Sequence, residues 1–316
     1  MPEKPQSSRL PVDTLTIAAL LLCAAAFAHL RQPQQLVELV QRLPGTIERP
    51  LLAPVTYLAL LLILVAERVA PAVPRQRSLN AGALQDLAYF FLLTPAAIIL
   101  VFIWLRELDE LFRTHLWFLV LDVGDGLPWV LLVVLSVLIG DFLAWFHHWL
   151  RHKVPLFWKF HAVHHAQREL NAFTDARFHP LDLLVAQTVA FLPFFVLGGQ
   201  LKDRVGDAAL IALFLTWLPR FYHANVRGRF GPLRYVFVTP QSHRVHHSAL
   251  PEHADRNFGV IFSVWDRLFR THCDADVYPP TGVEDPRVGA DQNVAPLAVV
   301  RSIWADMVYP FRRTQR

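Results

Sequence analysis

Four long apolar runs constrain the fold of this chain more than any other feature. They begin at Thr14, Leu51, Leu87 and Leu127, and each is long enough to cross a lipid bilayer as a helix. Apolar residues make up 54% of the 316 residues and charged residues only 18%, which is too apolar for an ordinary soluble domain. The first run lacks a convincing cleavage site, so we expect a retained helix and not a signal peptide. The sequence therefore predicts an all-α, polytopic membrane protein with four long transmembrane helices.

A shorter helical hairpin is expected after the fourth run. Two apolar stretches, residues 181–199 and 207–218, flank a polar turn, and the two helices either span the bilayer or dip into it. The sequence around Pro193 (FLPFF) either lines an apolar channel or packs against lipid, and Pro95 is expected to kink the third run. These boundaries divide the chain into N-terminal transmembrane helices (1–126), a histidine-rich region (127–282) and a cytoplasmic or interfacial tail (283–316).

The distribution of cations predicts the orientation. Many cations follow the fourth run, among them Arg151, Lys153, Lys159 and Arg168, and the C-terminal tail is rich in arginine. The positive-inside rule then places both the histidine-rich region and the N-terminus in the cytoplasm. The net charge of +4 comes from scattered arginines, which argues against nucleic acid as a partner and favours anionic lipid headgroups.

Nine histidines near the predicted membrane boundary form a recurring pattern. They occur as H-x-x-x-H at the end of the fourth run, H-x-x-H-H after it, a lone histidine after the hairpin, and a second H-x-x-H-H. Because positions i, i+3 and i+4 share one face of a helix, each cluster can aim its imidazoles at one point. Imidazole is costly to bury without a partner, so nine convergent rings predict bound metal. The nine are His148, His152, His161, His164, His165, His223, His243, His246 and His247.

The remaining histidines are given other roles. His147 neighbours His148 but points about 100° away from it around a helix, so we expect it not to be a ligand. For His179 three roles stay open: a tenth ligand, a hydrogen-bond donor to a ligand, or a helix cap. The others are expected to cap helices or line interfaces; they are His29, His115, His253 and His272.

The number of ligands bears on the choice of metal. Imidazole suits zinc, copper, nickel and iron alike, but a zinc site takes only three or four protein ligands. Nine histidines can instead serve two metals with four or five each and leave positions open for water or dioxygen. The chain also lacks the H-E-x-x-H motif of zinc proteases. Two non-haem irons are therefore favoured, with zinc as a mis-metallated alternative.

The order of these motifs resembles the sterol desaturase and fatty acid hydroxylase superfamily of membrane di-iron enzymes. The stretches that carry the resemblance are DFLAWFHHWLRHKVPLFWKFHAVHH, RFHPLD, TPQSHRVHH and RNFGVIFSVWDRLFRTH, between Asp141 and Gly282. Asp141, Asn257, Trp265 and Asp266 match recurrent positions with supporting or structural roles. The chain departs from the pattern at Trp149, where many members have arginine, and at Arg270, where many have glycine.

The resemblance implies an enzyme of a particular kind. It implies that the nine histidines are the catalytic iron ligands of a cytoplasmic helical cap, in a bacterial-type protein of the inner membrane. It also implies that the enzyme uses iron, O2 and two electrons to hydroxylate or desaturate a C–H bond of a membrane lipid, with hydroxylation slightly favoured. Sterols, fatty acyl chains, ether lipids and isoprenoids are all compatible substrates, and the oligomeric state stays open.

Other groups complete the expected chemistry. The sequence has no dinucleotide motif and no cysteine set for an iron–sulfur cluster, so an external electron-donor protein is expected. Acidic and amide side chains are available to orient the imidazoles through their second nitrogen; these are Asp141, Asn171, Asp175, Asn225 and Asp255. The alternative is a membrane protein that binds or transports metal without redox chemistry. That alternative predicts ionisable residues inside the spans, where the sequence has few.

Overall fold

The computed structural model describes residues 54–76, 80–121, 127–196, 217–228, 230–289 and 294–312. These residues are mostly helical, and their β-structure is limited to three isolated bridges. The helices are α3 (Pro54–Val69), α4 (Ala81–Ala88), α5 (Thr94–Thr114), α6 (Trp129–Lys153), α7 (Pro155–His165), α8 (Pro180–Val196), α11 (Pro240–His246), α12 (Val264–Leu268) and α13 (Pro296–Val308), with the π-helix η1 (Tyr89–Leu93) between α4 and α5. The predicted helical character is confirmed for this part of the chain.

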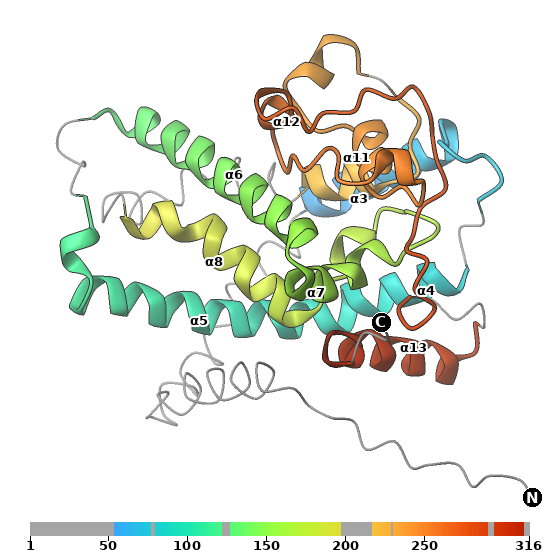
Figure 1. Cartoon of the computed structure of the whole chain (residues 1–316), viewed down its shortest axis with the longest axis horizontal. Coiled ribbons are helices and arrows are strands. Elements are labelled where there is room, and N and C mark those ends of the chain that lie inside the picture. The colour runs from blue at the N-terminus through green and yellow to red at the C-terminus, as the bar shows by residue number, and fades with distance from the viewer. Residues whose placement is uncertain are drawn as a thin grey trace, which may run out of the picture.

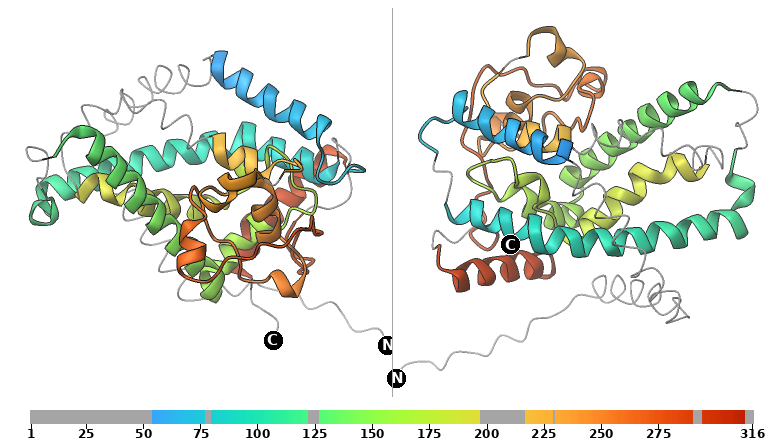
Figure 2. Two further views of the ribbon diagram at one scale, coloured as in Figure 1. Left: turned by 90° about the horizontal axis from the view of Figure 1, so that it is seen from above. Right: turned by 180° about the vertical axis from the view of Figure 1, so that it is seen from behind.

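The long helices extend from one side of the molecule, and the shorter elements gather at the other (Figure 1). α8 packs against both α5 and α6, and α7 packs against the end of α6. The segments that carry α11 and α12 fold over the same end, as the second pair of views also shows (Figure 2). The chain thus has a bundle of apolar helices joined to a compact helical cap.

Two of the described helices are long and apolar enough to cross a membrane. One is continuous from Ala81 to Thr114 and contains the predicted third run; the other, Val130–Lys153, contains most of the fourth, which was expected to begin at Leu127. Pro180–Pro193 is apolar but shorter, in agreement with the shorter hairpin. The second predicted run appears as α3, with 16 described residues. The first run and most of the second arm of the hairpin lie outside the described residues.

Pro95 is accommodated by a change of helix type. Proline cannot donate the backbone hydrogen bond of a regular helix, and the turn before Pro95 is the π-helix η1, in which the Thr94 amide donates to the Tyr89 carbonyl. A π-turn of this kind inserts one residue and lets two helical segments continue as one. The expected kink at Pro95 is therefore realised as a π-turn within a long helix.

A buried arginine ties distant parts of the cap together. The Arg177 guanidinium is fully buried and donates to Asp86 Oδ1 on α4 at 2.6 Å and to Asp306 Oδ2 on α13 at 3.3 Å. The second Asp86 oxygen accepts from the Asn171 amide and the Thr174 hydroxyl, both at 2.8 Å. α13 is thus packed into the fold through Asp306.

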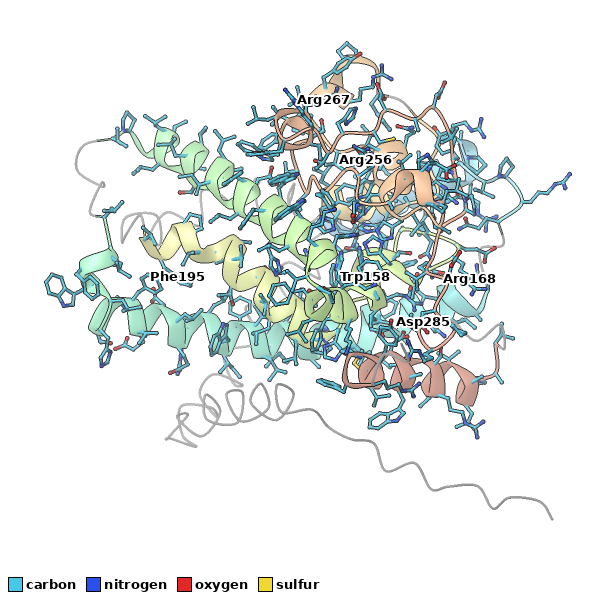
Figure 3. All side chains as sticks on the ribbon, in the orientation of Figure 1. Trp158, Arg168, Phe195, Arg256, Arg267 and Asp285 are labelled. Carbon is cyan, nitrogen blue, oxygen red and sulfur yellow. The ribbon has the colours of Figure 1, made fainter. Side chains whose placement is uncertain are left out.

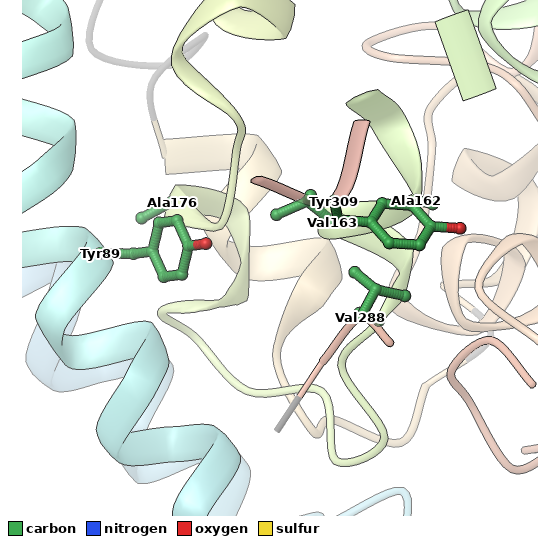
Figure 4. Close-up of a cluster of buried hydrophobic side chains, with 7 residues drawn as sticks. Tyr89, Ala162, Val163, Ala176, Val288 and Tyr309 are labelled. Atoms are coloured by element: carbon green, nitrogen blue, oxygen red, sulfur yellow. The ribbon is translucent and has the colours of Figure 1, made fainter. Parts of the chain in front are cut away.

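An apolar cluster lies next to this network (Figure 4). Tyr89 from η1 and Tyr309 at the end of α13 are both buried in it, together with Val163 of α7 and Val288. The Tyr89 hydroxyl donates to Asp306 Oδ2 at 3.1 Å, which joins the cluster to the Arg177 network. Since Val163 lies between His161 and His164 in sequence, this packing fixes the helix that carries three of the nine histidines.

The Arg177 network predicts a large loss of stability on removal of Asp86. In Asp86→Ala, the buried guanidinium loses one of its two carboxylates, and we expect the free energy of unfolding to fall by about 3–5 kcal/mol. Denaturant unfolding of the purified protein in detergent, followed by circular dichroism, measures this loss. Glu110→Ala is the matched control because Glu110 pairs with Arg113 on the surface, where such pairs contribute at most about 1 kcal/mol. Equal losses in the two variants would contradict the prediction.

Candidate metal centre

The structure brings all nine predicted histidines together in two adjacent groups. Four elements supply them: the end of α6, α7, the helical residues 217–223, and α11 with the residue that follows it. Within each group the potential ligand nitrogens lie within 4.8 Å of one another. The first group is His148, His152, His161, His165 and His246, and the second is His164, His223, His243 and His247.

Local sequence explains how these elements place their rings. Pro155 starts α7 directly after α6 ends, and the single extended residue Val154 separates the two helices. α11 begins with a capping box, in which Thr239 and Ser242 satisfy each other's backbone, and with Pro240 in its first turn. These signals start each short helix at a defined residue, and the H-x-x-H-H spacing then turns its imidazoles inward.

His164 and His223 present two lone pairs to each other. The Nδ1 of His164 donates to the Arg177 carbonyl at 3.2 Å, and the Nδ1 of His223 donates to the Pro219 carbonyl at 2.7 Å. With the proton on Nδ1, each neutral ring has a bare Nε2, and these two Nε2 atoms are 3.1 Å apart. No proton lies between them unless one ring becomes an imidazolium, which burial opposes by lowering the pKa of both rings. A cation between the two nitrogens removes the repulsion.

The first group repeats this arrangement. His148 Nδ1 donates to the Phe258 carbonyl at 2.8 Å, and His161 Nδ1 donates to the Asp182 carboxylate at 3.1 Å, since a carboxylate can only accept. Their Nε2 atoms are 3.1 Å apart. His246 Nδ1 donates to the Arg256 carbonyl at 2.8 Å, and its Nε2 is buried without a hydrogen-bond partner among the described residues, as is the Nε2 of His152.

These distances test whether the groups fit metal ions. The Nε2 atoms of His164, His223, His243 and His247 follow one another at 3.1, 2.8 and 3.1 Å. Two nitrogens that each lie about 2.1 Å from one ion, at an angle of about 90°, are separated by about 3.0 Å. The buried, uncharged donor set and its spacing therefore fit a transition-metal ion in each group.

The segment 256–266 holds two of the rings through its carbonyls. Asp141 on α6 accepts from the amides of Ile261 and Phe262 and from the indole of Trp265, at 2.8, 3.1 and 2.8 Å. Asp266 accepts from the Phe258 amide at 2.8 Å and from the Trp145 indole at 3.0 Å. These bonds clamp the segment to α6, so that the carbonyls of Arg256 and Phe258 meet His246 and His148.

Asn257 has a backbone role in the same segment. Its φ of 58° lies in the left-handed region, which asparagine tolerates better than most residues. Its side-chain amide donates to the carbonyls of Ser242 and Cys273, and its oxygen accepts from the Cys273 amide. The turn that exposes the two flanking carbonyls to the histidines is therefore held from both sides.

A charged pair that was not expected from the sequence supports His161. The Asp182 carboxylate oxygen that accepts from His161 also accepts from the Arg151 guanidinium at 3.0 Å, and both charged side chains are buried. Arg151, one of the cations that follow the fourth run, therefore turns its guanidinium inward to Asp182. The sequence offers one signal for Asp182, since RFHPLD carries an acid in the first turn of an apolar helix.

The structure places the other candidates outside both groups. His179 Nδ1 accepts from the Leu181 amide and its Nε2 donates to the Met307 carbonyl, both at 3.2 Å, so it caps α8 and contacts the end of α13. His147 packs beside Phe157, away from the two groups, and His272 is also outside them.

The four other expected supporting residues mostly bond elsewhere. Asp175 pairs with Arg220, and Asn171 donates to Asp86. Asn225 accepts from the Val73 amide. Asp255 pairs with Lys153 and has one oxygen 3.8 Å from His152 Nδ1, so it alone of these four lies near a grouped histidine. The ring of Trp158, labelled in Figure 3, lies tilted against two rings of the first group, with centroids 5.0 Å from His152 and 5.4 Å from His165.

Because the histidine rings are buried in their neutral form, we expect the free energy of unfolding of the metal-free protein to depend on pH. Burial lowers the pKa of His223 to about 3 and that of His246 to about 4, whereas both are about 6.5 in the unfolded chain. The unfolded state thus binds more protons, so stability is full above pH 6.5 and falls as the pH drops toward 4. Each ring contributes up to about 1.4 kcal/mol per pH unit.

Chemical denaturation of the chelator-treated protein at several pH values measures this slope. We expect a clearly shallower slope in the double variant His223→Gln, His246→Gln, in which two of the titrating rings are absent. An unfolding free energy that is constant between pH 7 and pH 5 would contradict the prediction.

Comparison with known proteins identifies the relatives of this chain. Residues 133–271 match the fatty acid hydroxylase family. The chain is 29% identical to the ornithine lipid hydroxylase of Rhizobium tropici over 205 residues, which cover 65% of this chain and 56% of that protein. It is 28% identical to the alkylglycerol monooxygenase of Caenorhabditis elegans over 166 residues, and 26% identical to the human enzyme of that name over 200 residues.

The aligned regions leave much of these relatives unmatched. They cover 50% of this chain and 31% of the Caenorhabditis elegans protein, and 61% and 39% for the human one. No solved structure matches the chain. The matched segment nevertheless contains all nine grouped histidines and the clamping residues Asp141 and Asp266. Over residues 133–271 the chain is therefore similar to the fatty acid hydroxylase family.

Proposed function

We propose that this protein is a membrane-bound, O2-dependent lipid hydroxylase with two irons held by the nine histidines. The observation that carries the proposal is the pair of buried imidazole groups whose bare Nε2 atoms face one another. The first group would hold one ion through His148, His152, His161, His165 and His246, and the second would hold the other through His164, His223, His243 and His247. When bound, iron supplies the O2 and electron-transfer chemistry that can break an unactivated C–H bond.

The residues of the chain would orient the ligands and keep water out. Backbone carbonyls and Asp182 fix which nitrogen faces inward in five of the nine rings, and such support commonly changes metal affinity about 10- to 100-fold. Burial of the rings separates the reacting atoms from bulk water, which favours attack on the substrate. Hydroxylation consumes O2, two electrons and two protons, and releases the hydroxylated lipid and water. The electrons would come from an external donor protein.

The exposed apolar side chains support placement in a membrane. Along α6 they include Val130, Val134 and Leu138, each at least 37% exposed, and along α5 Phe102 and Leu111 are at least 41% exposed. Such helices are stable when lipid and not water surrounds them. We propose a multi-pass protein of the inner membrane, with four long spans, a catalytic region over residues 127–282 and the histidines on the cytoplasmic side.

The relatives narrow the class of substrate. Their names specify an ornithine lipid hydroxylase and alkylglycerol monooxygenases, and neither name denotes a sterol or a desaturase. We therefore favour hydroxylation of a lipid with a polar headgroup and a flexible chain over oxidation of a sterol or an isoprenoid.

Replacement of single histidines should remove metal from one group at a time. In His165→Ala the first group loses a ligand, so we expect the metal content to fall from about two ions per chain toward one and activity to be lost. His147→Ala is the matched control, because this buried histidine lies on the same boundary but outside both groups. Elemental analysis of iron and zinc in protein purified from iron-replete cells measures the result. Loss of an ion in the control but not in His165→Ala would refute the assignment.

Comparative lipid mass spectrometry tests the activity. We expect cells that express the intact protein under aerobic, iron-replete conditions to contain a lipid heavier by one oxygen, which is absent with the His165→Ala variant. A lipid lighter by two hydrogens would instead indicate desaturation. An unchanged lipidome, in cells whose protein carries two metals, would favour metal binding or transport over lipid oxidation.

A further inference from the structure

An exposed apolar patch lies on the cap beside α6. It consists of residues from the 3-10 helix η4 (Gly231–Tyr235) and from α12, with the residue that follows each. The two elements are joined directly: the Ser263 amide donates to the Val236 carbonyl, and the Ser263 hydroxyl donates to the Arg234 carbonyl, both at 2.8 Å. The patch comprises Leu233, Tyr235, Val236, Val264, Leu268 and Phe269, each between 42% and 66% exposed. Such a patch on a soluble surface marks an interaction site.

Contacts between the patch and α6 show at which level of the proposed bilayer the patch lies. The Phe269 ring stacks on Trp145 with ring centroids 4.5 Å apart, and the Trp265 indole donates to Asp141. α12 accordingly lies beside the middle of α6 in Figure 1. From Trp129 at the start of α6, Trp145 is about 24 Å along the helix axis. With Trp129 placed at one edge of a hydrocarbon core about 30 Å thick and α6 along its normal, Trp145 lies within several ångströms of the other edge.

The residues that follow on α6 agree with this depth. Phe146 is 42% exposed, and its ring stacks on Trp149 one turn before the polar end of the helix. Aromatic residues of this kind are enriched where a membrane helix meets the headgroups. The exposed apolar side of α6 and the patch thus reach the same level.

Cations surround the patch. Arg267 stacks over the Tyr235 ring at 4.7 Å, in the region labelled at the top of Figure 3, and Arg234 pairs with Asp274 at 3.5 Å. The Arg270 side chain is exposed, although its φ of 61° lies in the left-handed region that favours glycine. A positive residue kept at a strained position beside an apolar surface suits an anionic headgroup.

We propose that the patch formed by η4 and α12 inserts into the cytoplasmic boundary of the bilayer and anchors the cap against anionic phospholipid. The inference rests on the proposed membrane placement of α6. Its consequence is that the cap holds a fixed height above the lipid, and Asp266 of α12 links the anchored surface to His148 through Phe258. The partner is lipid and not a protein, because the patch continues the apolar side of a helix that already faces lipid.

Site-directed fluorescence tests the proposal. The full chain, with Cys23 and Cys273 replaced by serine, carries Leu268→Cys labelled with an environment-sensitive dye, in nanodiscs that hold one copy each. We expect phospholipids brominated in the chain to quench this label at least severalfold more than a label at Glu252→Cys, an exposed site outside the patch. Aqueous iodide should show the opposite order. Leu233→Cys provides a second position if the first variant fails to fold.

The other outcomes overturn the proposal. A label at residue 268 that iodide reaches freely and brominated lipid does not quench shows a solvated patch. If the label at residue 268 is protected from iodide only in discs that hold two copies of the protein, a second chain covers the patch. The headgroup arm compares discs with and without phosphatidylglycerol: we expect this lipid to increase quenching at residue 268, and Arg270→Glu to abolish the increase. Quenching needs neither metal nor turnover, so it is independent of whether the protein proves to be a hydroxylase.

Discussion

The repulsion between inward-facing lone pairs is the constraint on which this structure depends. His164 and His223 each use Nδ1–H for a carbonyl, and their Nε2 atoms then meet at 3.1 Å with no proton between them. Such an arrangement is costly in a protein interior without a cation, since burial also opposes the imidazolium form. Metal bound by the two histidine groups would therefore stabilise the fold of the cap.

The surrounding fold serves to keep these nitrogens in place. Asp141 and Asp266 hold the carbonyls that orient His148 and His246, whereas Arg177 supplies its own carbonyl to His164 and anchors itself to Asp86 and Asp306. Both clamps use buried carboxylates that already have several donors. Hydrogen bonds to buried carboxylates therefore hold the segments of the cap together, and the apolar clusters fill the space between them.

Much of the site followed from local patterns. The spacing of the histidines, read with the periodicity of a helix, indicated all nine members of the two groups and left out His147, which lies about 100° away from His148 around α6. The supporting residues were harder to find. Asp182 lies 21 positions from His161 and Arg177 lies 129 from Asp306, and no repeat or periodicity connects residues at such distances.

The sequence by itself determined the helical character, the apolar runs and the set of histidines, because composition and short-range periodicity act within one helix. Tertiary structure alone decided the division into groups of five and four, the nitrogen that five of the rings turn inward, and the burial of Arg151. In those five rings the orientation depends on which carbonyl or carboxylate lies opposite Nδ1. Phe258 meets His148 across 110 positions of chain, and only the packing of α6, α7 and the segment 256–266 brings them within hydrogen-bond distance.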